Sequence, residues 1–447
     1  MTQTSTRSPT PSASVDWPEL DRRHLWHPYT QMAVAPPPIP IVRGEGVWLH
    51  TADGRRILDG ISSWWVNIHG HAHPRLNRAL AEQAATLEHV IFAGFTHEPG
   101  ARLAAELVAR TPGELNHVFY SDDGSTAVEV AMKMAYQAWH LRGEPERTLF
   151  VALDDAYHGD TFGTMAAGGV GAFHGTFSNL FFEVRRAATP ASVGRAGAGE
   201  DLATILERDG HRVAAVLVEP MLQGAAGMLV QPPDFLRRVR RLTREHGIPL
   251  IADEIFTGFG RTGRMFACEH ADDPAGGPVV PDLLCLSKAL SGGYLPLAAT
   301  LASDAIYEAF LSDDRSKTFF HGHSYTGNAL ACAVGVESLR LFDDEDRLGR
   351  IAELERLFTE RMARVAERSR VRSPRVLGPM AAFDVEPDGA GGYLDDLGPR
   401  LYGAFLERDV LLRPLGNVVY FLPPYVITDD ECHRVFDTIE TVLDDIA

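Results

Sequence analysis

Short, nearly uninterrupted apolar runs recur along the middle of this chain, and stretches with helical spacing of apolar residues separate them. The runs occupy residues 117–120, 148–151, 214–218, 249–252 and 282–286. Apolar and polar positions do not alternate within them, so both faces of each strand are expected to be buried. This pattern is typical of a mainly parallel sheet with helices on both faces. The sequence therefore predicts an α/β fold built around one such sheet.

Changes in composition divide the chain of 447 residues into four parts. Residues 1–16 are rich in Ser, Thr and Pro, and they are predicted to form a disordered tail. Residues 17–75 contain a predicted hairpin and are expected to pack against a smaller domain. Residues 76–335 form the large domain with the sheet. Residues 336–447, with charged helices and predicted strands at 376–385 and 418–422, form the small C-terminal α+β domain.

Charge and cysteine usage limit the classes of partner. Lys and Arg number 42 and Asp and Glu number 60, which gives a formal charge of −18. Nucleic acid and anionic lipid repel such a chain, so small-molecule substrates are the expected partners. No apolar run approaches the ~18–20 residues that cross a bilayer. The four cysteines lie far apart, and no apolar signal stretch occurs near the start, so a reducing, cytoplasmic location is expected.

Two motifs suggest functions that the rest of the sequence does not support. Residues 258–263 satisfy G-x-G-x-x-G, but no long helix pattern follows, as a dinucleotide site requires. His69 and His71 alternate and would share one face of a strand, as in some metal hydrolases. No H-E-x-x-H motif accompanies them, so a polar turn is the favoured interpretation. A metal-dependent hydrolase that uses this pair stays a remote alternative.

Four polar features follow predicted strands, where open α/β sheets bind their ligands. Gly124 and Ser125 open a helix, where backbone N–H groups and a hydroxyl can hold a phosphate. Asp253 and Lys288 each end an apolar run, where a lone charge is costly. Tyr157 lies in a loop after a fourth strand. Helix capping, a salt bridge and ordinary packing would explain each one alone, whereas bound pyridoxal phosphate explains them together.

The chain resembles the class III, fold-type-I, pyridoxal-phosphate aminotransferases between about Arg23 and Val426. The most specific segments are residues 250–263 (LIADEIFTGFGRTG) and 286–293 (LSKALSGG). The resemblance implies a large mainly parallel sheet domain and a smaller α+β domain. It also implies that Asp253 binds the cofactor's ring nitrogen and that Lys288 bonds its aldehyde. Tyr157 is expected to act beside them as a third catalytic residue.

Within this class, four further segments resemble the members that aminate 8-amino-7-oxononanoate in biotin biosynthesis. They are residues 24–30 (HLWHPYT), 62–65 (SSWW), 157–163 (YHGDTFG) and 412–416 (LRPLG). The resemblance implies that Tyr29, Trp64 and Tyr157 line the substrate channel, that Arg413 binds the distal carboxylate, and that Gly322 lies beside the substrate. Another class III aminotransferase, acting on an ω-amino acid or a diamine, is the alternative.

Three positions depart from the family's usual pattern. Asp123 stands where many members have Ser, and Ala156 stands where a Gly is usual. The segment 321–327 (HGHSYTG) replaces an H-G-P-T stretch whose residues reach the phosphate in the neighbouring subunit. The resemblance therefore implies a homodimer in which His323 and Ser324 make that contact. It leaves the amino donor open between S-adenosylmethionine, which we favour, and lysine.

Overall fold

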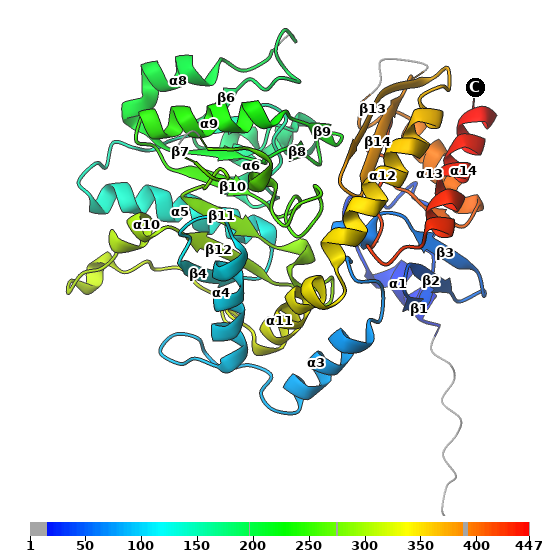
Figure 1. Ribbon diagram of the computed structural model, residues 1–447, viewed down its shortest axis with the longest axis horizontal. Coiled ribbons are helices and arrows are strands. Elements are labelled where there is room, and N and C mark those ends of the chain that lie inside the picture. The colour runs from blue at the N-terminus through cyan, green and yellow to red at the C-terminus, as the bar shows by residue number, and fades with distance from the viewer. Residues whose placement is uncertain (1–15, 196, 274–275, 388–391, 447) are drawn as a thin grey trace, which may run out of the picture.

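A seven-stranded sheet forms the centre of the larger part of the molecule (Figure 1). The computed structural model describes residues 16–195, 197–273, 276–387 and 392–446. The strand order is β4 (His117–Ser121), β12 (Ala298–Ala302), β11 (Leu283–Leu286), β10 (Leu250–Asp253), β7 (Val213–Val218), β5 (Leu149–Leu153) and β6 (Val184–Ala187). The pairs from β11 to β6 are parallel, and β12 runs antiparallel to both neighbours. The predicted α/β class is confirmed.

Helices cover both faces of this sheet, as the continuous apolar strands predict. Adjacent residues of β10 point to opposite faces, so Ile251 joins one buried cluster and Leu250 joins the other. The first cluster contains α5 (Gly124–Leu141) and α10 (Asp304–Glu308). The second contains α4 (Glu98–Arg110), α8 (Leu202–Asp209), α9 (Pro233–Glu245) and α11 (Ala329–Asp344).

The smaller part joins the two ends of the chain. A three-stranded antiparallel sheet of β13 (Val371–Leu377), β14 (Met380–Val385) and β16 (Val418–Phe421) packs with α12 (Arg347–Val365), α13 (Leu397–Glu407) and α14 (Asp429–Asp445). A second sheet has the order β1 (Ile41–Glu45), β2 (Trp48–Thr51), β3 (Arg56–Asp59) and β15 (Val410–Leu411). Because β15 pairs with β3, the N-terminal segment is hydrogen-bonded to the C-terminal part.

The single strand predicted at residues 376–385 is wrong. The structure has a hairpin there, with β13 and β14 joined by a turn at Gly378, whose φ is +55°. A Cβ at this glycine would lie 2.3 Å from the backbone nitrogen of Gly263. The turn therefore brings the small sheet against the loop that follows β10.

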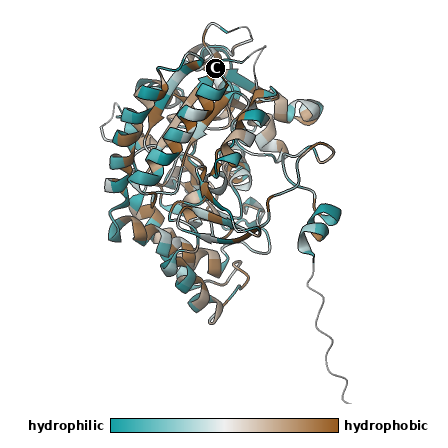
Figure 2. Ribbon diagram, turned by 90° about the vertical axis from the view of Figure 1, so that its right-hand side faces the viewer, coloured by the Kyte–Doolittle hydropathy of each residue, from teal (hydrophilic) through white to brown (hydrophobic). Residues whose placement is uncertain are grey.

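The remaining short elements lie mostly in connections and at the N-terminal end. They are α1 (Trp17–His24), α2 (Ser62–Trp65), α3 (Pro74–Ala84), α6 (Phe162–Ala167), α7 (Gly171–His174), and the 3₁₀ turns η1 (Gly175–Leu180), η2 (Gly210–Arg212), η3 (Ala267–His270), η4 (Lys288–Ser291) and η5 (Arg315–Lys317), with the small ribbon β8 (Leu222–Gln223) and β9 (Leu229–Val230). Helix α1 stands apart from the main body in Figure 2 and has no buried residue.

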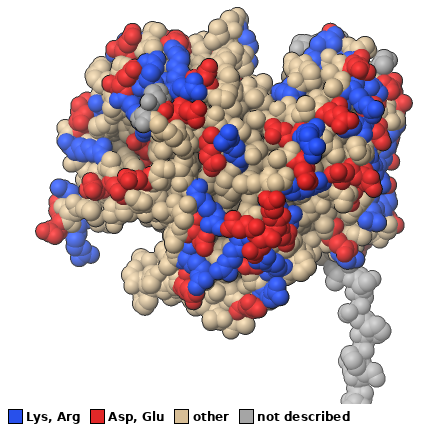
Figure 3. Space-filling view, in the orientation of Figure 1, with Lys and Arg blue, Asp and Glu red and all other residues tan. Residues whose placement is uncertain are grey.

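The predicted disordered tail lies outside the described residues, apart from Asp16. The Asp16 side chain caps α1 by accepting a hydrogen bond from the backbone of Glu19. Basic and acidic side chains are interspersed over the face shown in Figure 3. No helix within the described ranges is both long and apolar enough to cross a membrane.

Candidate active site

Lys288 follows β11 and opens the 3₁₀ turn η4 at the carboxyl edge of the sheet. Its Nζ lies 4.6 Å from the ring centroid of Trp65 and 5.3 Å from that of Phe256. Burial among these rings lowers the pKa of Lys288 to about 8, against the opposing effect of Asp253 and Glu219. An appreciable fraction of this amine is therefore neutral at neutral pH, which a nucleophile or a proton acceptor requires.

Asp253 ends β10, the strand parallel to β11, and reaches the same cavity as Lys288. The carboxylate is 5% exposed. Its Oδ2 lies 2.7 Å from Nδ1 of His158, and its Oδ1 accepts a hydrogen bond from the N–H of Ile255 at 3.1 Å. These contacts fix the orientation of the carboxylate and compensate for its loss of water. The cavity encloses about 710 Å³.

Gly124 and Ser125 lie where β4 leads into the 18-residue helix α5. The Ser125 hydroxyl lies 2.8 Å from the hydroxyls of both Thr161 and Thr164. A Cβ on Gly124 would lie 2.7 Å from Ile255, so only glycine fits against this part of the cavity wall. Asp123 caps α5 by accepting from the N–H of Thr126 at 3.0 Å, which directs its charge to the helix backbone.

These residues fit a phosphorylated aromatic aldehyde. The first turn of α5 and the adjoining hydroxyls suit a phosphate, and the glycine leaves space for it. A buried carboxylate suits a protonated ring nitrogen, and the largely buried lysine suits an aldehyde. Nε2 of His158 is buried and has no hydrogen-bond partner within the described part of the chain. The Nδ1 atom of the same ring makes the contact with Asp253.

Glu219 is a buried cavity residue that the sequence interpretation missed. It directly follows β7, accepts hydrogen bonds from the N–H groups of Tyr157 (2.9 Å) and Gly224 (3.2 Å), and is 6% exposed. Burial raises the pKa of Glu219 to about 7. The signal was the same as for Asp253, a carboxylate immediately after a continuous apolar run. Glu219 positions the backbone of the loop that carries Tyr157.

Aromatic side chains from distant segments adjoin the cavity at Tyr157. The Tyr29 hydroxyl lies 3.1 Å from that of Tyr157 and donates to Asp160 at 2.7 Å. The Tyr29 ring is 5.5 Å from the Trp64 ring, and the Arg413 guanidinium lies 4.6 Å above Trp64. Burial raises the pKa of Tyr29 to about 12, so its hydroxyl stays protonated. The predicted channel residues are thus in mutual contact, with one cation at the outer end.

The two tryptophans belong to a left-handed turn in α2. The φ angles of Ser62, Ser63, Trp64 and Trp65 are +51°, +45°, +69° and +74°. A left-handed conformation costs an L-residue roughly 1–2 kcal/mol. Four such residues in succession therefore require specific contacts that hold the backbone. The segment SSWW contains no glycine, so its sequence does not predict a left-handed backbone.

Gly322, His323 and Ser324 are not among the described residues that line the cavity. Gly322 and Ser324 are exposed, and Nε2 of His323 lies 3.3 Å from Oδ1 of Asp122. Within this chain His323 thus contacts the cavity wall through Asp122, and none of the three residues lines the cavity itself.

The alternating histidines have structural partners. Nε2 of His69 lies 3.0 Å from the Ser338 hydroxyl, and Nε2 of His71 lies 2.9 Å from Oδ2 of Asp59. In the part of the chain that the structure describes, no group of three or more His, Cys, Asp or Glu side chains could hold a metal ion. The pair therefore serves the packing of the N-terminal segment.

Known proteins resemble the chain over nearly its whole length. Residues 29–443 match the aminotransferase class-III family. The adenosylmethionine-8-amino-7-oxononanoate aminotransferase of Synechococcus elongatus is 46% identical, covering 95% of this chain and 99% of that protein. The crystal structure of the enzyme of that name from Methanocaldococcus jannaschii superposes with a TM-score of 0.89 at 36% identity, covering 96% of this chain and 98% of the other.

A more distant structural neighbour is an ω-transaminase. The thermostable six-fold mutant from Pseudomonas jessenii has a TM-score of 0.89 at 26% identity, covering 96% of this chain and 98% of that one. Fold similarity at this identity does not separate the two activities. The family match and the similarity at 46% identity together show that this chain belongs to the class-III aminotransferases, a family of pyridoxal-phosphate-dependent enzymes.

Proposed function

We propose that this aminotransferase transfers an amino group to the C7 ketone of 8-amino-7-oxononanoate, giving 7,8-diaminononanoate for biotin synthesis. The observation that carries the proposal is the layout of the cavity and of the aromatic passage beside it. Lys288, Asp253 and Tyr157 line the cavity, and Tyr29 joins it at Tyr157 to an aromatic passage formed by Tyr29, Trp64 and Arg413. A long aliphatic acid needs such an aromatic passage with one distant cation. The names of the relatives support the same substrate.

We propose pyridoxal phosphate as the cofactor. The start of α5, with Gly124 and Ser125, would hold the phosphate, Asp253 would pair with the ring nitrogen, and Lys288 would bond the aldehyde carbon. When bound, the cofactor stores electrons withdrawn from the carbon that carries the reacting amine. The pyridinium keeps its charge only beside an anion, so Asp253 must stay ionised. His158 and the Ile255 N–H hold that carboxylate in place.

Lys288 is the proposed proton carrier. Its Nζ lies beside Trp65 and Phe256, which exclude water from one side of the amine. A pKa of about 8 lets the amine take up a proton and release it again near neutral pH. Tyr157 extends from the loop held by Glu219 to Tyr29, so it links the reacting end of the cavity to the passage.

Arg413 is proposed to bind the distal carboxylate of the oxo acid. The guanidinium lies 4.6 Å from the centroid of the Trp64 ring, and its N–H groups can make a bidentate contact with a carboxylate. The cation thus stands at the far end of an apolar wall. A diamine lacks the carboxylate, so this residue favours the oxo acid over a diamine.

We propose that the enzyme acts as a homodimer in the cytoplasm. In this arrangement His323 and Ser324 reach the phosphate in the partner's site, and Gly322 lies beside the partner's substrate. Their position outside their own cavity supports this role. The four free cysteines are buried, which suits a reducing compartment. We also propose the domain division 17–75, 76–335 and 336–447, supported by two buried clusters, one centred on the large sheet and one on the smaller part.

The test is a substrate experiment with the purified protein loaded with pyridoxal phosphate. The oxononanoate is supplied with either S-adenosylmethionine or lysine, and diaminononanoate is followed by mass spectrometry. We expect product with S-adenosylmethionine, the donor that we favour. Product with lysine alone would overturn only the donor. Absence of product with either donor, together with turnover of an ω-amino acid or diamine, would overturn the proposed substrate.

A further inference from the structure

The left-handed turn formed by Ser62, Ser63, Trp64 and Trp65 contains no glycine, the residue that tolerates this conformation best. At Ser63 and Trp64 both angles are left-handed, with φ/ψ of 45°/54° and 69°/47°. Strained backbone of this kind persists only where the surroundings hold it, and it concentrates at functional sites. Specific contacts must therefore hold this turn, and the turn determines where Trp64 and Trp65 lie.

One buried carboxylate contacts Ser63 of the turn through both its backbone and its side chain. Asp59 ends β3, and its side chain is completely buried. Its Oδ1 accepts hydrogen bonds from the N–H groups of Ile61 (3.2 Å) and Ser63 (2.9 Å). Its Oδ2 accepts from the Ser63 hydroxyl at 2.7 Å and lies 2.9 Å from Nε2 of His71. A neighbouring contact completes the cluster, because Nδ1 of His71 lies 3.0 Å from the Asn67 amide.

The two tryptophans of the turn depend on Asp59 to different degrees. Trp65 has anchors of its own, because its indole N–H donates to the Tyr420 hydroxyl at 3.1 Å and its carbonyl accepts from Arg261 at 3.1 Å. Trp64 instead contacts the two other residues of the passage, namely the ring of Tyr29 and the guanidinium of Arg413. Loss of the Asp59 contacts should therefore displace Trp64 more than Trp65. The inner end of the cavity, with Lys288 against Trp65, should be left in place.

We propose that Asp59 is a positioning residue for oxo-acid recognition. By fixing the left-handed backbone at Ser63, it places the Trp64 ring under the Arg413 guanidinium and so sets where the substrate carboxylate is received. Asp59 does not itself touch the substrate. The inference rests on the proposed function in one respect, namely that the passage of Tyr29, Trp64 and Arg413 receives the oxo acid.

The first test separates the two half-reactions in Asp59→Ala. We expect the KM for the oxononanoate to rise roughly tenfold or more, because its carboxylate site is misplaced. The rate of the donor half-reaction, followed by the absorbance of the cofactor, should stay close to the wild-type value. Asp59→Asn keeps an oxygen for the two N–H groups and should retain most of the affinity. Asp53→Ala, which removes an exposed carboxylate from the same segment, is the matched control and should change neither value.

The second test needs no turnover. Ser63→Gly and Ser63→Ala both lose the hydroxyl contact to Asp59, and they differ in tolerance of positive φ. We expect the glycine variant to melt at a higher temperature than the alanine variant. Adding Ser63→Gly to Asp59→Ala should also recover part of the lost oxo-acid affinity. Should Asp59→Ala fail to fold, the comparison at position 63 and the Asp59→Asn kinetics decide the matter.

Two outcomes would overturn the inference. One is an unchanged KM for the oxo acid in Asp59→Ala. The other is an alanine variant at position 63 as stable as the glycine variant. Failure of the proposed function looks different, because the wild-type protein itself would then not aminate the oxononanoate while the melting temperatures at position 63 would still differ.

Discussion

The cavity and the aromatic passage that adjoins it, the inner and outer ends of the site, are built in different ways. At the inner end, Asp253 ends one strand, Lys288 lies just beyond the neighbouring strand, and Glu219 follows the next strand of the same sheet. At the outer end, Tyr29 and Trp64 come from the N-terminal segment and Arg413 from the smaller part hundreds of residues later, and they meet through ring and cation contacts. The Tyr29 side chain is 41% exposed, whereas Asp253 is 5% exposed. In the proposed assignment, the sheet holds the reacting groups, and the loops and the smaller part receive the substrate.

This contrast predicts that substitutions at the inner end abolish the reaction whatever the substrate, and that those at the outer end change substrate preference. Buried charges held by backbone hydrogen bonds tolerate little displacement. Exposed aromatic contacts contribute affinity in smaller and more separable amounts. The following predictions test that difference.

Lys288→Ala should give the largest effect. The variant should fold, because the substitution removes a cationic group that burial disfavours, but it should show no turnover with any donor. Steady-state assays with a circular-dichroism check of folding measure this. Lys317→Ala, which changes a lysine outside the cavity, is the control and should keep full activity. Turnover by Lys288→Ala above a hundredth of the wild-type rate would be inconsistent with the proposed role.

Arg413→Ala should act on one substrate only. Loss of a charge-assisted contact should raise the free energy of oxononanoate binding by about 1.5–3 kcal/mol, with donor binding unchanged. Separate KM measurements for the oxononanoate and for the amino donor show whether only the former is affected. Arg434→Ala removes a comparable Arg–Trp contact, over Trp48, away from the cavity, and should leave both values unchanged. An equal loss for both substrates would place Arg413 outside the oxo-acid site.

Lys288→Met should stabilise the cofactor-free protein in a pH-dependent manner. Burial lowers the pKa of Lys288 from 10.5 to about 8, so the unfolded chain binds the proton more tightly than the folded one. Wild-type stability is therefore reduced below pH 8 and recovers as pH rises from about 8 toward 10.5. Denaturant unfolding at pH 7 and at pH 9.5 should show the advantage of the methionine variant shrinking at the higher pH. A constant difference would refute the lowered pKa.

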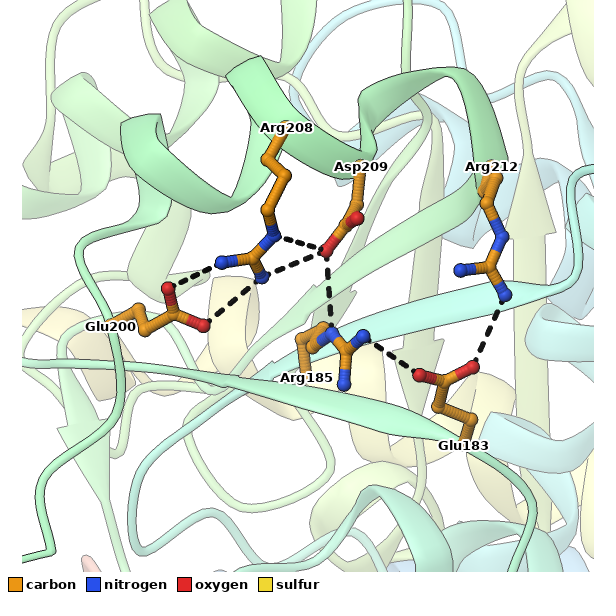
Figure 4. Close-up of polar contacts among 6 residues, drawn as sticks. All are labelled: Glu183, Arg185, Glu200, Arg208, Asp209 and Arg212. Carbon is orange, nitrogen blue, oxygen red and sulfur yellow. Dashed lines mark hydrogen bonds and ion pairs between the residues drawn. The ribbon is translucent and has the colours of Figure 1, made fainter.

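The smallest effect is expected far from the cavity. Figure 4 shows an ion-pair network in which Arg208 contacts Glu200 and Asp209, and Arg185 contacts Asp209 and Glu183. The Arg208 and Glu200 side chains are 46% and 49% exposed, so water and salt screen their attraction. Arg208→Ala should lower the Tm slightly, and added salt should remove the difference. A large, salt-independent loss would show that this network holds the fold.

The inner end was predictable from the sequence because a topological rule places it. Asp253 and Lys288 each end an apolar run, and the carboxyl ends of parallel strands lie at the same edge of the sheet for any conformation of the loops. Glu219 carried the same signal after residues 214–218 and was nevertheless missed. The antiparallel strand β12 and the turn at Gly378 were also missed, because short apolar runs do not reveal direction or a tight glycine turn.

The outer end was predictable only by resemblance to a family. No local pattern indicates that Tyr29 meets Tyr157, or that Arg413 lies over Trp64, since these contacts depend on how the smaller part packs. The left-handed turn at residues 62–65 lies beyond sequence reasoning altogether. Its conformation opposes the preferences of serine and tryptophan, and Asp59 contacts Ser63 from outside the turn.

The most direct test of the account is to locate the cofactor's covalent attachment. The sequence contains only three lysines, Lys133, Lys288 and Lys317, so peptide mapping gives an unambiguous result. The protein is loaded with pyridoxal phosphate, reduced with borohydride, digested and analysed by mass spectrometry. We predict a single pyridoxyl modification on Lys288. Modification of Lys133 or Lys317 instead, or of no lysine at all, would contradict the assignment of the cavity as the active site.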